Sequence, residues 1–358
     1  MSGAPAAGGD SYARLVWRRF RRSRLGMAGL IALALIGVVL LIGPFLAPHD
    51  PDQRFASYQP PSRIGIDSSG LYAVNARPTG AIDPVTFQPV LSRDGAPRER
   101  LGLFVRVPRY RLIGPVMANR RLVAPIAPGG RLHLMGADRF GRDIFSRGLV
   151  AARVSMLIAL AVGGLTTLAG LIVGATSGYI GGAVDRWIQR GVDFLLAFPQ
   201  LPLYLTLGAL IPVTVSSGLF VAILILTLSV LGWAGLSREI RGKTLTLARM
   251  DYVRAAVALG AGDRRIILRH IAPNLMSHLL VSFTLTLPAV VLLESFLGFL
   301  GLAVKPPMIS WGLMLQDVSG YAAIGSYPFI LFPVVFVFVA VFAFNAVGDA
   351  LRDAVDPY

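Results

Sequence analysis

The sequence RGKT, at positions 241–244, is the part of this chain closest to a phosphate-binding loop. In a Walker A loop a first glycine stands five positions before the Gly-Lys pair, because the backbone N–H groups between them hold the phosphates of a nucleotide. Ser237 occupies that position here. Gly-x-Ser-x-Gly and His-Glu-x-x-His motifs, which would indicate a serine nucleophile or a catalytic zinc, are also absent. We therefore predict no catalytic residue and no ATPase site in this chain, which is expected not to be an enzyme.

Metal ligands are few. The sequence has no cysteine, which excludes disulfides, iron–sulfur clusters and thiolate zinc sites. The four histidines show no metal-ligand spacing in any pair; they are His49, His133, His270 and His278. We predict no metal site, and one histidine acting with distant carboxylates is left open as an alternative.

Two carboxylates, Asp193 and Glu294, fall inside long apolar runs. A charge in lipid is costly, so such residues are candidate intramembrane functional residues that bind an ion or a polar substrate. Asp193 is expected near the inner end of its run and Glu294 in the outer third of its run. Pairing or solvation near the membrane surface is the alternative for both.

The elements that carry these residues are predicted to be membrane helices. Of the 358 residues, 54% are hydrophobic and 15% are charged, whereas soluble domains average about 25% charged residues. Mean hydropathy is +0.65. A spanning helix needs about 20 mostly apolar residues. Six stretches meet that length, and each must be helical because lipid offers no partner for backbone polar groups; they are 26–47, 155–177, 191–213, 218–236, 276–300 and 328–348.

The distribution of charge gives the orientation. The net charge of +15 and a pI near 11.0 would suggest nucleic acid in a soluble protein, but here six arginines precede the first apolar run; they are Arg14, Arg18, Arg19, Arg21, Arg22 and Arg24. By the positive-inside bias both termini are cytoplasmic, and we predict no nucleic-acid partner. A secretory signal peptide is the alternative for the first run, but that run is too long and lacks a small-x-small cleavage site.

Segment 48–137 differs from the rest of the chain, with frequent Pro and Gly and short apolar stretches. Apolar residues alternate at Leu101, Leu103, Val105 and Val107, which is typical of a strand with one buried face. The fold class is therefore an all-α polytopic membrane protein with six transmembrane helices and a small β-containing extracytoplasmic insertion between the first two. The expected division is a basic cytoplasmic tail at 1–25, the first helix at 26–47, the insertion at 48–137 and a five-helix core at 138–358.

A stripe of small residues runs along the second predicted span. Thr166, Gly170, Gly174 and Gly178 recur every four residues, so they share one helix face. Small residues let another backbone approach closely, which is how helices associate in lipid. Helix packing is the main interpretation, and a conduction path along that face is the alternative.

A charged hairpin, 251–274, lies within the cytoplasmic segment 237–275 between the fourth and fifth spans. The first part of the hairpin has helical spacing of its apolar and small residues, at Val253, Ala256, Val257 and Gly260. Gly260 or Gly262 can take the left-handed conformation that ends a helix. A second short helix is expected from Asp263, as its cap, to Pro273. The exposed small and basic residues suit a groove in a partner protein. An amphipathic hairpin lying on anionic lipid is the alternative.

The stretches RAAVALGAG (254–262) and ILRHIAPN (267–274) resemble the EAA loop of ATP-binding-cassette (ABC) importer permeases of the dipeptide, oligopeptide and nickel family. Four further stretches resemble the second-permease, C-type subunit of that family in order and spacing: GADRFGRDIFSR at 136–147, VDFLLAFP at 192–199, ESFLGFLGLAVKPPMISWG at 294–312 and FNAVGDALRDAVDP at 344–357. The resemblance covers 14–48 and 136–357 and says nothing of 48–135.

The resemblance implies an ATPase-docking site. Arg254, Ala255 and Ala256 occupy the EAA triplet, with Gly260 as its glycine; the closing residues are His270, Pro273 and Asn274. Arg254 stands where the family has Glu, which removes any role for a carboxylate there. Ala137 stands where the family usually has Thr.

A type I ABC importer permease-like fold is also implied, in the inner membrane of a bacterium. The implied partners are a second homologous permease, one or two ABC ATPase subunits, an extracytoplasmic solute-binding protein and membrane lipid. No cofactor is expected on this chain, and ATP and Mg are expected on the ATPases. The implied function is uptake of peptides or similar small solutes by alternating access, with nickel and oligosaccharides left open.

Two other functions remain as alternatives to this one. An ion-coupled transporter or channel would use Asp193 and Glu294 and need no ATPase partner. A membrane anchor or receptor would have the outer insertion as its working part.

Overall fold

The computed structural model describes residues 12–355 apart from 69, 83, 85–88, 213, 303, 319 and 320. The first eleven residues of the predicted tail and the end of the last motif, Asp356 and Pro357, lie outside the described residues. The described helices are α1 (Tyr12–Phe20), α2 (Arg24–Leu46), α3 (Ile144–Ile180), α4 (Gly182–Ala197), α5 (Gln200–Ala209), α6 (Ser217–Leu247), α7 (Asp251–Ala258), α8 (Asp263–Ile266), α9 (Ala272–Leu297), α10 (Trp311–Gln316), α11 (Tyr321–Ser326) and α12 (Pro333–Val355). Three short non-α turns complete them: η1 (Ile267–Ile271), η2 (Gly298–Leu302) and η3 (Pro328–Leu331).

Five helices in the described part of the chain are long and apolar enough to cross a membrane: Arg24–Leu46, Ile144–Ile180, Ser217–Leu247, Asp263–Leu302 and Pro328–Val355. The pair α4 and α5 counts as a sixth crossing if it is taken as one broken span. The span predicted over 191–213 is therefore not one continuous helix, because α4 and α5 meet at 81°. Pro199 lies at the break, where it lacks an N–H and restricts the residue before it.

The outer surface of the helices is apolar, as lipid contact requires. On α2, Leu25, Ile31 and Leu35 are 76%, 58% and 62% exposed. A soluble protein rarely exposes such a continuous apolar stripe. Membrane-facing side chains therefore explain the exposure, and the buried core lies between α3, α6, α9 and α12.

The small-residue stripe of α3 packs against α6. A Cβ added at Gly174 would lie 2.5 Å from the backbone oxygen of Ser237, and one at Gly178 would lie 2.7 Å from that of Arg241. A Cβ added at Gly170 would lie 2.9 Å from the side chain of Leu236. The three glycines of the stripe thus pack against α6, which agrees with helix packing, whereas Thr166 at its other end lines a groove described below.

Gly174→Ala is expected to destabilise the chain by about 1 to 3 kcal/mol, because the added methyl forces α6 away from α3. Gly164→Ala, on the same helix, meets no atom within 4 Å and should be neutral or slightly stabilising. Thermal unfolding of the two purified variants in detergent measures the difference. Equal stabilities would contradict the packing described here.

The insertion contains the six described strands, β1 (Arg63–Asp67), β2 (Gly70–Val74), β3 (Arg77–Ile82), β4 (Pro89–Ser92), β5 (Arg98–Ile113) and β6 (Val116–Pro125). They form an antiparallel sheet of order β1-β2-β5-β6 and a separate β3-β4 pair. The predicted strand at 101–107 is confirmed, but not its single buried face. Leu101 is buried while Leu103 is 68% exposed, and the next residue, Phe104, has a positive φ of 53°.

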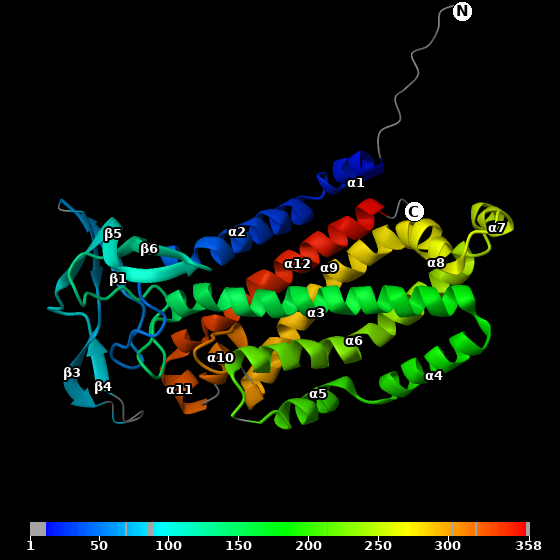
Figure 1. Ribbon diagram of the computed structural model, residues 1–358. Helices are drawn as coiled ribbons and strands as arrows, with labels where there is room; N and C mark the ends of the chain where they lie inside the picture. The colour runs from blue at the N-terminus through cyan, green and yellow to red at the C-terminus, as the bar shows by residue number, and fades with distance from the viewer. Residues whose placement is uncertain are drawn as a thin grey trace, which may run out of the picture.

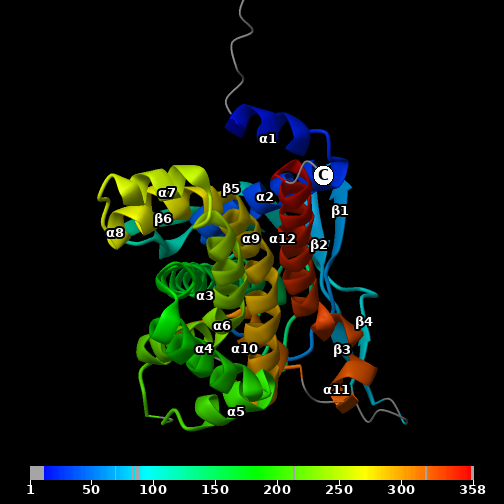
Figure 2. The ribbon, with the colours of Figure 1, turned by 90° about the vertical axis from the view of Figure 1, so that its right-hand side faces the viewer.

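The insertion and the helical hairpin lie at opposite ends of the helix bundle (Figure 1). The described N-terminal helix α1 packs on the C-terminal end of α12, where Phe20 is buried with Ala350 and Ala354. Both described ends of the chain therefore lie toward the end that carries α7 (Figures 1 and 2). We call this the hairpin end of the bundle and the other the insertion end.

A buried pair of histidines joins the insertion to α3. His49 Nε2 accepts a hydrogen bond from the Leu132 N–H at 2.9 Å, and the His49 N–H donates to Ser146 Oγ at 3.1 Å. His133 Nδ1 lies 3.1 Å from Asp143 Oδ1. Burial lowers the pKa of His49 to about 4, helped by His133 and Arg121 and opposed by Asp143.

Acidification is therefore expected to destabilise the junction between the insertion and the bundle. The unfolded chain protonates His49 below about pH 6.5, while the folded chain does so only near pH 4. Protons thus favour the unfolded state, and roughly 3 kcal/mol of stability is lost as pH falls between those values.

Thermal unfolding of the full chain in detergent from pH 7.5 to 4 measures this loss. His49→Gln keeps an acceptor for the Leu132 N–H, and its stability should depend less steeply on pH. An unchanged slope in that variant would contradict the assignment.

Candidate functional site

The first arm of the helical hairpin (251–274) is α7, and it ends as the sequence predicts. The Gly260 N–H donates to the Val257 oxygen at 2.9 Å, and the Ala261 N–H donates to the Ala256 oxygen at 3.0 Å. This pair of bonds is a Schellman motif, which needs a left-handed residue after the helix. Gly260, at φ 81°, is that residue, whereas Gly262 is extended.

The second arm is not a separate short helix, which corrects the prediction. Helix α8 continues through the π-helical turn η1 into α9 without a break. Gly262 takes the cap position, and Asp263 is the first residue of the helix. Pro273 does not end the arm, although it has no N–H to donate within the helix. The second arm is therefore an extension of the membrane helix α9.

The closing residues of the motif fasten the two arms together. Asn274 Nδ2 donates to the His270 oxygen at 2.7 Å and to Tyr252 Oη at 3.2 Å. The Tyr252 and His270 rings lie 6.5 Å apart. Tyr252, which follows the first residue of α7, was not among the predicted site residues. Its position beside a helix start gave no signal of a contact across the hairpin.

The base of the helical hairpin is anchored in a small apolar core. Val253, Ile266 and Ile271 are fully buried there, against Ile240 of α6 and Leu275 of α9. Ala175 of α3 closes the same cluster. Because the core joins α7 to three long helices, a force on the hairpin acts directly on α6 and α9.

The outer surface of the hairpin is exposed and partly apolar. Leu259 is 89% exposed and Val257 is 50% exposed, and Arg254 and Ala255 also lie on the surface. Ala256 is half-buried. We call Arg254, Ala255, Val257 and Leu259 the docking face.

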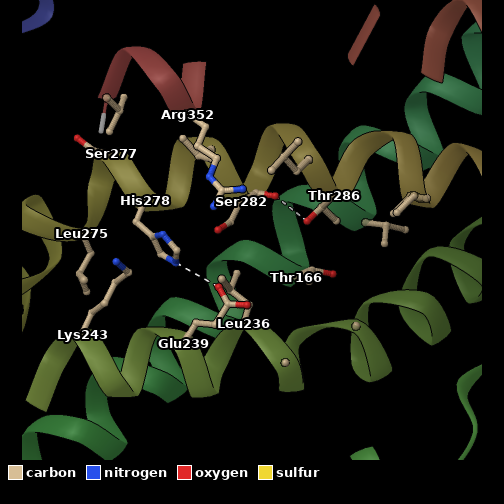
Figure 3. A pocket seen from close by; sticks show the side chains of 18 of the residues that line it. Thr166, Leu236, Glu239, Lys243, Leu275, Ser277, His278, Ser282, Thr286 and Arg352 are labelled. Carbon is tan, nitrogen blue, oxygen red and sulfur yellow. Dashed lines mark hydrogen bonds and ion pairs between the residues drawn. The ribbon is translucent and has the colours of Figure 1, made fainter. Parts of the chain in front are cut away.

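A groove of about 1270 Å³ runs between α3, α5, α6, α9 and α12. Its hairpin end is charged: Glu239 of α6 and His278 of α9 are 3.2 Å apart, and Lys243 and Arg352 also line it (Figure 3). Thr166, Ser282 and Thr286 provide hydroxyl groups farther along. The spacing of Glu239 and Lys243 could have marked one polar face of α6, but no sequence signal gave the contact with α9.

The two intramembrane carboxylates lie apart from this groove. Asp193 of α4 forms an ion pair with Arg238 of α6, and both side chains are substantially exposed. Glu294 is 2% exposed; its Oε2 accepts from Ser155 Oγ at 3.2 Å, and that hydroxyl accepts from the Trp311 N–H at 3.0 Å. Neither carboxylate is among the described residues that line the groove. Glu294 thus joins α9 to α3 and α10.

The motif at 136–147 forms a clasp at the insertion end. Asp143 caps α3 by accepting from the Ser146 N–H at 2.8 Å. Arg139 and Arg142 both donate to Asp317, which follows α10, and Arg142 also bonds Asp138. These contacts fasten the motif to the end of α10.

No group of three or more His, Cys, Asp or Glu residues within the described ranges could hold a metal ion. His270 lies in the helical hairpin and His278 in the groove, while His49 and His133 lie at the insertion.

Comparison with known proteins agrees with this architecture. The family described as "binding-protein-dependent transport system inner membrane component" matches residues 167–358, and "N-terminal TM domain of oligopeptide transport permease C" matches residues 11–61. The oligopeptide transport system permease protein OppC of Bacillus subtilis is 42% identical over 64% of this chain and 73% of its own length. The dipeptide transport system permease protein DppC of the same organism is 30% identical over 97% of this chain and 86% of its own.

The chain is also similar to a solved inward-facing structure of the MetNI methionine ABC transporter, with TM-score 0.45, 18% identity and coverage of 58% of this chain and 96% of that one.

The fold and the sequence comparisons define a multi-pass membrane permease of ABC transport systems. The chain belongs to the family of binding-protein-dependent transport system inner membrane components, and its relatives include the OppC and DppC permeases.

Proposed function

We propose that this chain is one of two membrane subunits of an ABC importer that takes up peptides. The names of its OppC and DppC relatives support peptides as the substrate class. The inner membrane of a bacterium, with both termini in the cytoplasm, is the proposed location, supported by the basic residues of the helical hairpin and of 14–24.

The observation that carries the proposal is the continuity of the helical hairpin with α9. The docking face sits on α7 and the turn after it, Asn274 fastens α7 to the second arm, and that arm extends a membrane helix through η1. Closure of a pair of ATPase subunits on the docking face would therefore tilt α9 and, through the buried Val253 and Ile240, also α6. These two helices form walls of the groove.

The groove is proposed as this subunit's half of the transport path. Its volume exceeds the roughly 300–1,000 Å³ of small-molecule pockets, which supports a solute of the size of a short peptide. Hydroxyl groups and charges of both signs suit peptide backbone and charged termini without selecting one side chain. A second, homologous permease would close the open side.

ATP and Mg are proposed to bind only to the separate ATPase subunits. Ser237 in place of the first Walker A glycine supports this, and RGKT lies within the continuous helix α6, where no phosphate loop can form. A solute-binding protein is proposed to deliver the peptide at the insertion end, and no nucleic acid is involved.

Affinity purification of the tagged chain from gently solubilised native membranes tests the proposal. A second permease and one or two Walker A ATPases should come with it, and should be lost when 251–274 is disrupted. Recovery of the chain alone, with full transport activity in liposomes lacking ATP, would overturn the proposal.

A further inference from the structure

The end of the β5–β6 hairpin lies beside a membrane helix rather than out in solvent. We call residues 103–120 the β-arm. Arg153 of α3 donates to the Leu40 and Leu41 oxygens of α2 and also to the Leu112 oxygen of the β-arm. The Phe45 ring of α2 and the Phe104 ring of the β-arm lie 6.0 Å apart. Because Leu40 and Leu41 belong to the insertion-end part of a membrane span, the tip of the β-arm lies beside that span.

The β-arm exposes apolar side chains at its tip and at its base. At the tip, Ile113, Val116 and Met117 are 40%, 51% and 55% exposed. At the base, Leu103 and Phe104 are each more than half exposed. Water would meet all five if the arm stood free. A bilayer surface beside α2 would instead bury them without any further protein.

The charges of the β-arm are all of one sign. Four arginines, Arg106, Arg109, Arg111 and Arg120, are exposed. Arg106 and Arg120 are direct cross-strand partners, an arrangement that is unfavourable unless an anion lies between them. No acidic residue occurs between Glu99 and Asp138. No ion pair of these four arginines is found among the described residues.

We propose that the β-arm docks on the lipid surface at the insertion end, with its apolar tip at the acyl boundary and its arginines on the phosphates of anionic lipids. Apolar insertion combined with cationic side chains is how interfacial elements bind bilayers. A protein partner could also meet these arginines, but the fixed position beside Leu40 and Leu41 favours lipid. This inference is independent of the transported solute.

The absence of native cysteines allows a direct test. Met117→Cys places a spin label at the tip, and Ile66→Cys places one on β1, which is 79% exposed and lies beyond the far end of the β-arm. Each labelled full chain is reconstituted into vesicles of phosphatidylcholine with or without phosphatidylglycerol. The label at 117 should be shielded from a water-soluble relaxation agent and accessible to oxygen. Both effects should be larger in vesicles that contain phosphatidylglycerol. The label at 66 should stay in water.

The variant Arg106→Gln/Arg120→Gln should weaken phosphatidylglycerol binding to the purified chain about tenfold, measured by native mass spectrometry. Arg63→Gln/Arg77→Gln removes two exposed arginines elsewhere in the insertion and should leave it unchanged. Three results would overturn the proposal: equal water accessibility at 117 and 66, no dependence on phosphatidylglycerol, or shielding of the 117 label only after a solute-binding protein is added.

Discussion

Gly260→Val is expected to reduce uptake by the assembled importer about tenfold while ATP hydrolysis continues. Gly260 has φ 81° and forms the Schellman turn after α7. A β-branched residue in the left-handed region costs on the order of 1–2 kcal/mol, so the turn should open and Leu259 should leave its position. A Cβ at this site meets no atom within 4 Å, so the effect comes from the backbone and not from a steric clash.

The matched control is Gly260→Asn, because asparagine tolerates the left-handed conformation. It should transport nearly as well as the natural chain. ATP hydrolysis and peptide uptake are measured on the same reconstituted complexes, and membrane insertion is checked by the yield of purified chain. Normal uptake by the valine variant, or equal loss in both variants, would count against mechanical coupling through this turn.

Leu259→Glu is expected to remove the ATPase subunits from the purified complex. Leu259 is 89% exposed, so the change should not disturb the fold of the chain itself. If the residue is a central apolar contact of the docking face, a buried unpaired carboxylate there should weaken binding by roughly thirtyfold or more. Quantification of the ATPase subunits that co-purify with the tagged variant measures the loss.

Ile66→Glu provides the control, because Ile66 is also strongly exposed but lies in the insertion, at the opposite end of the bundle. It should retain the ATPases in full. Retention of the ATPases by the Leu259 variant would show that docking does not use this face.

The transmembrane elements could be predicted because lipid imposes a simple rule on them. About 20 apolar residues form a helix in lipid whatever lies around them. The break at Pro199 was missed because α4 and α5 together satisfy the same count of apolar residues. In the insertion the strand at β5 was recognised, but the positive φ of Phe104 and the pairing order of the sheet depend on tertiary contacts.

Part of the candidate site could likewise be predicted from the sequence, and part of it could not. Gly260 or Gly262 was predicted to end α7, because a left-handed turn favours glycine and the helical spacing before them was clear, and the structure places Gly260 there. The contacts of Asn274 with Tyr252, and of Glu239 with His278, join separate elements and have no local signal. Glu294 was noticed for its charge, but its place between Ser155 and α10 follows from packing alone.

Peptide uptake by reconstituted proteoliposomes tests the central claim most directly. The chain purified with its second permease and ATPases should accumulate a labelled peptide, with its solute-binding protein present, only when ATP is supplied on the hairpin side. The chain alone should accumulate none, with or without an ion gradient. Gradient-driven uptake by the chain alone, independent of ATP, would contradict the assignment as an ABC importer subunit.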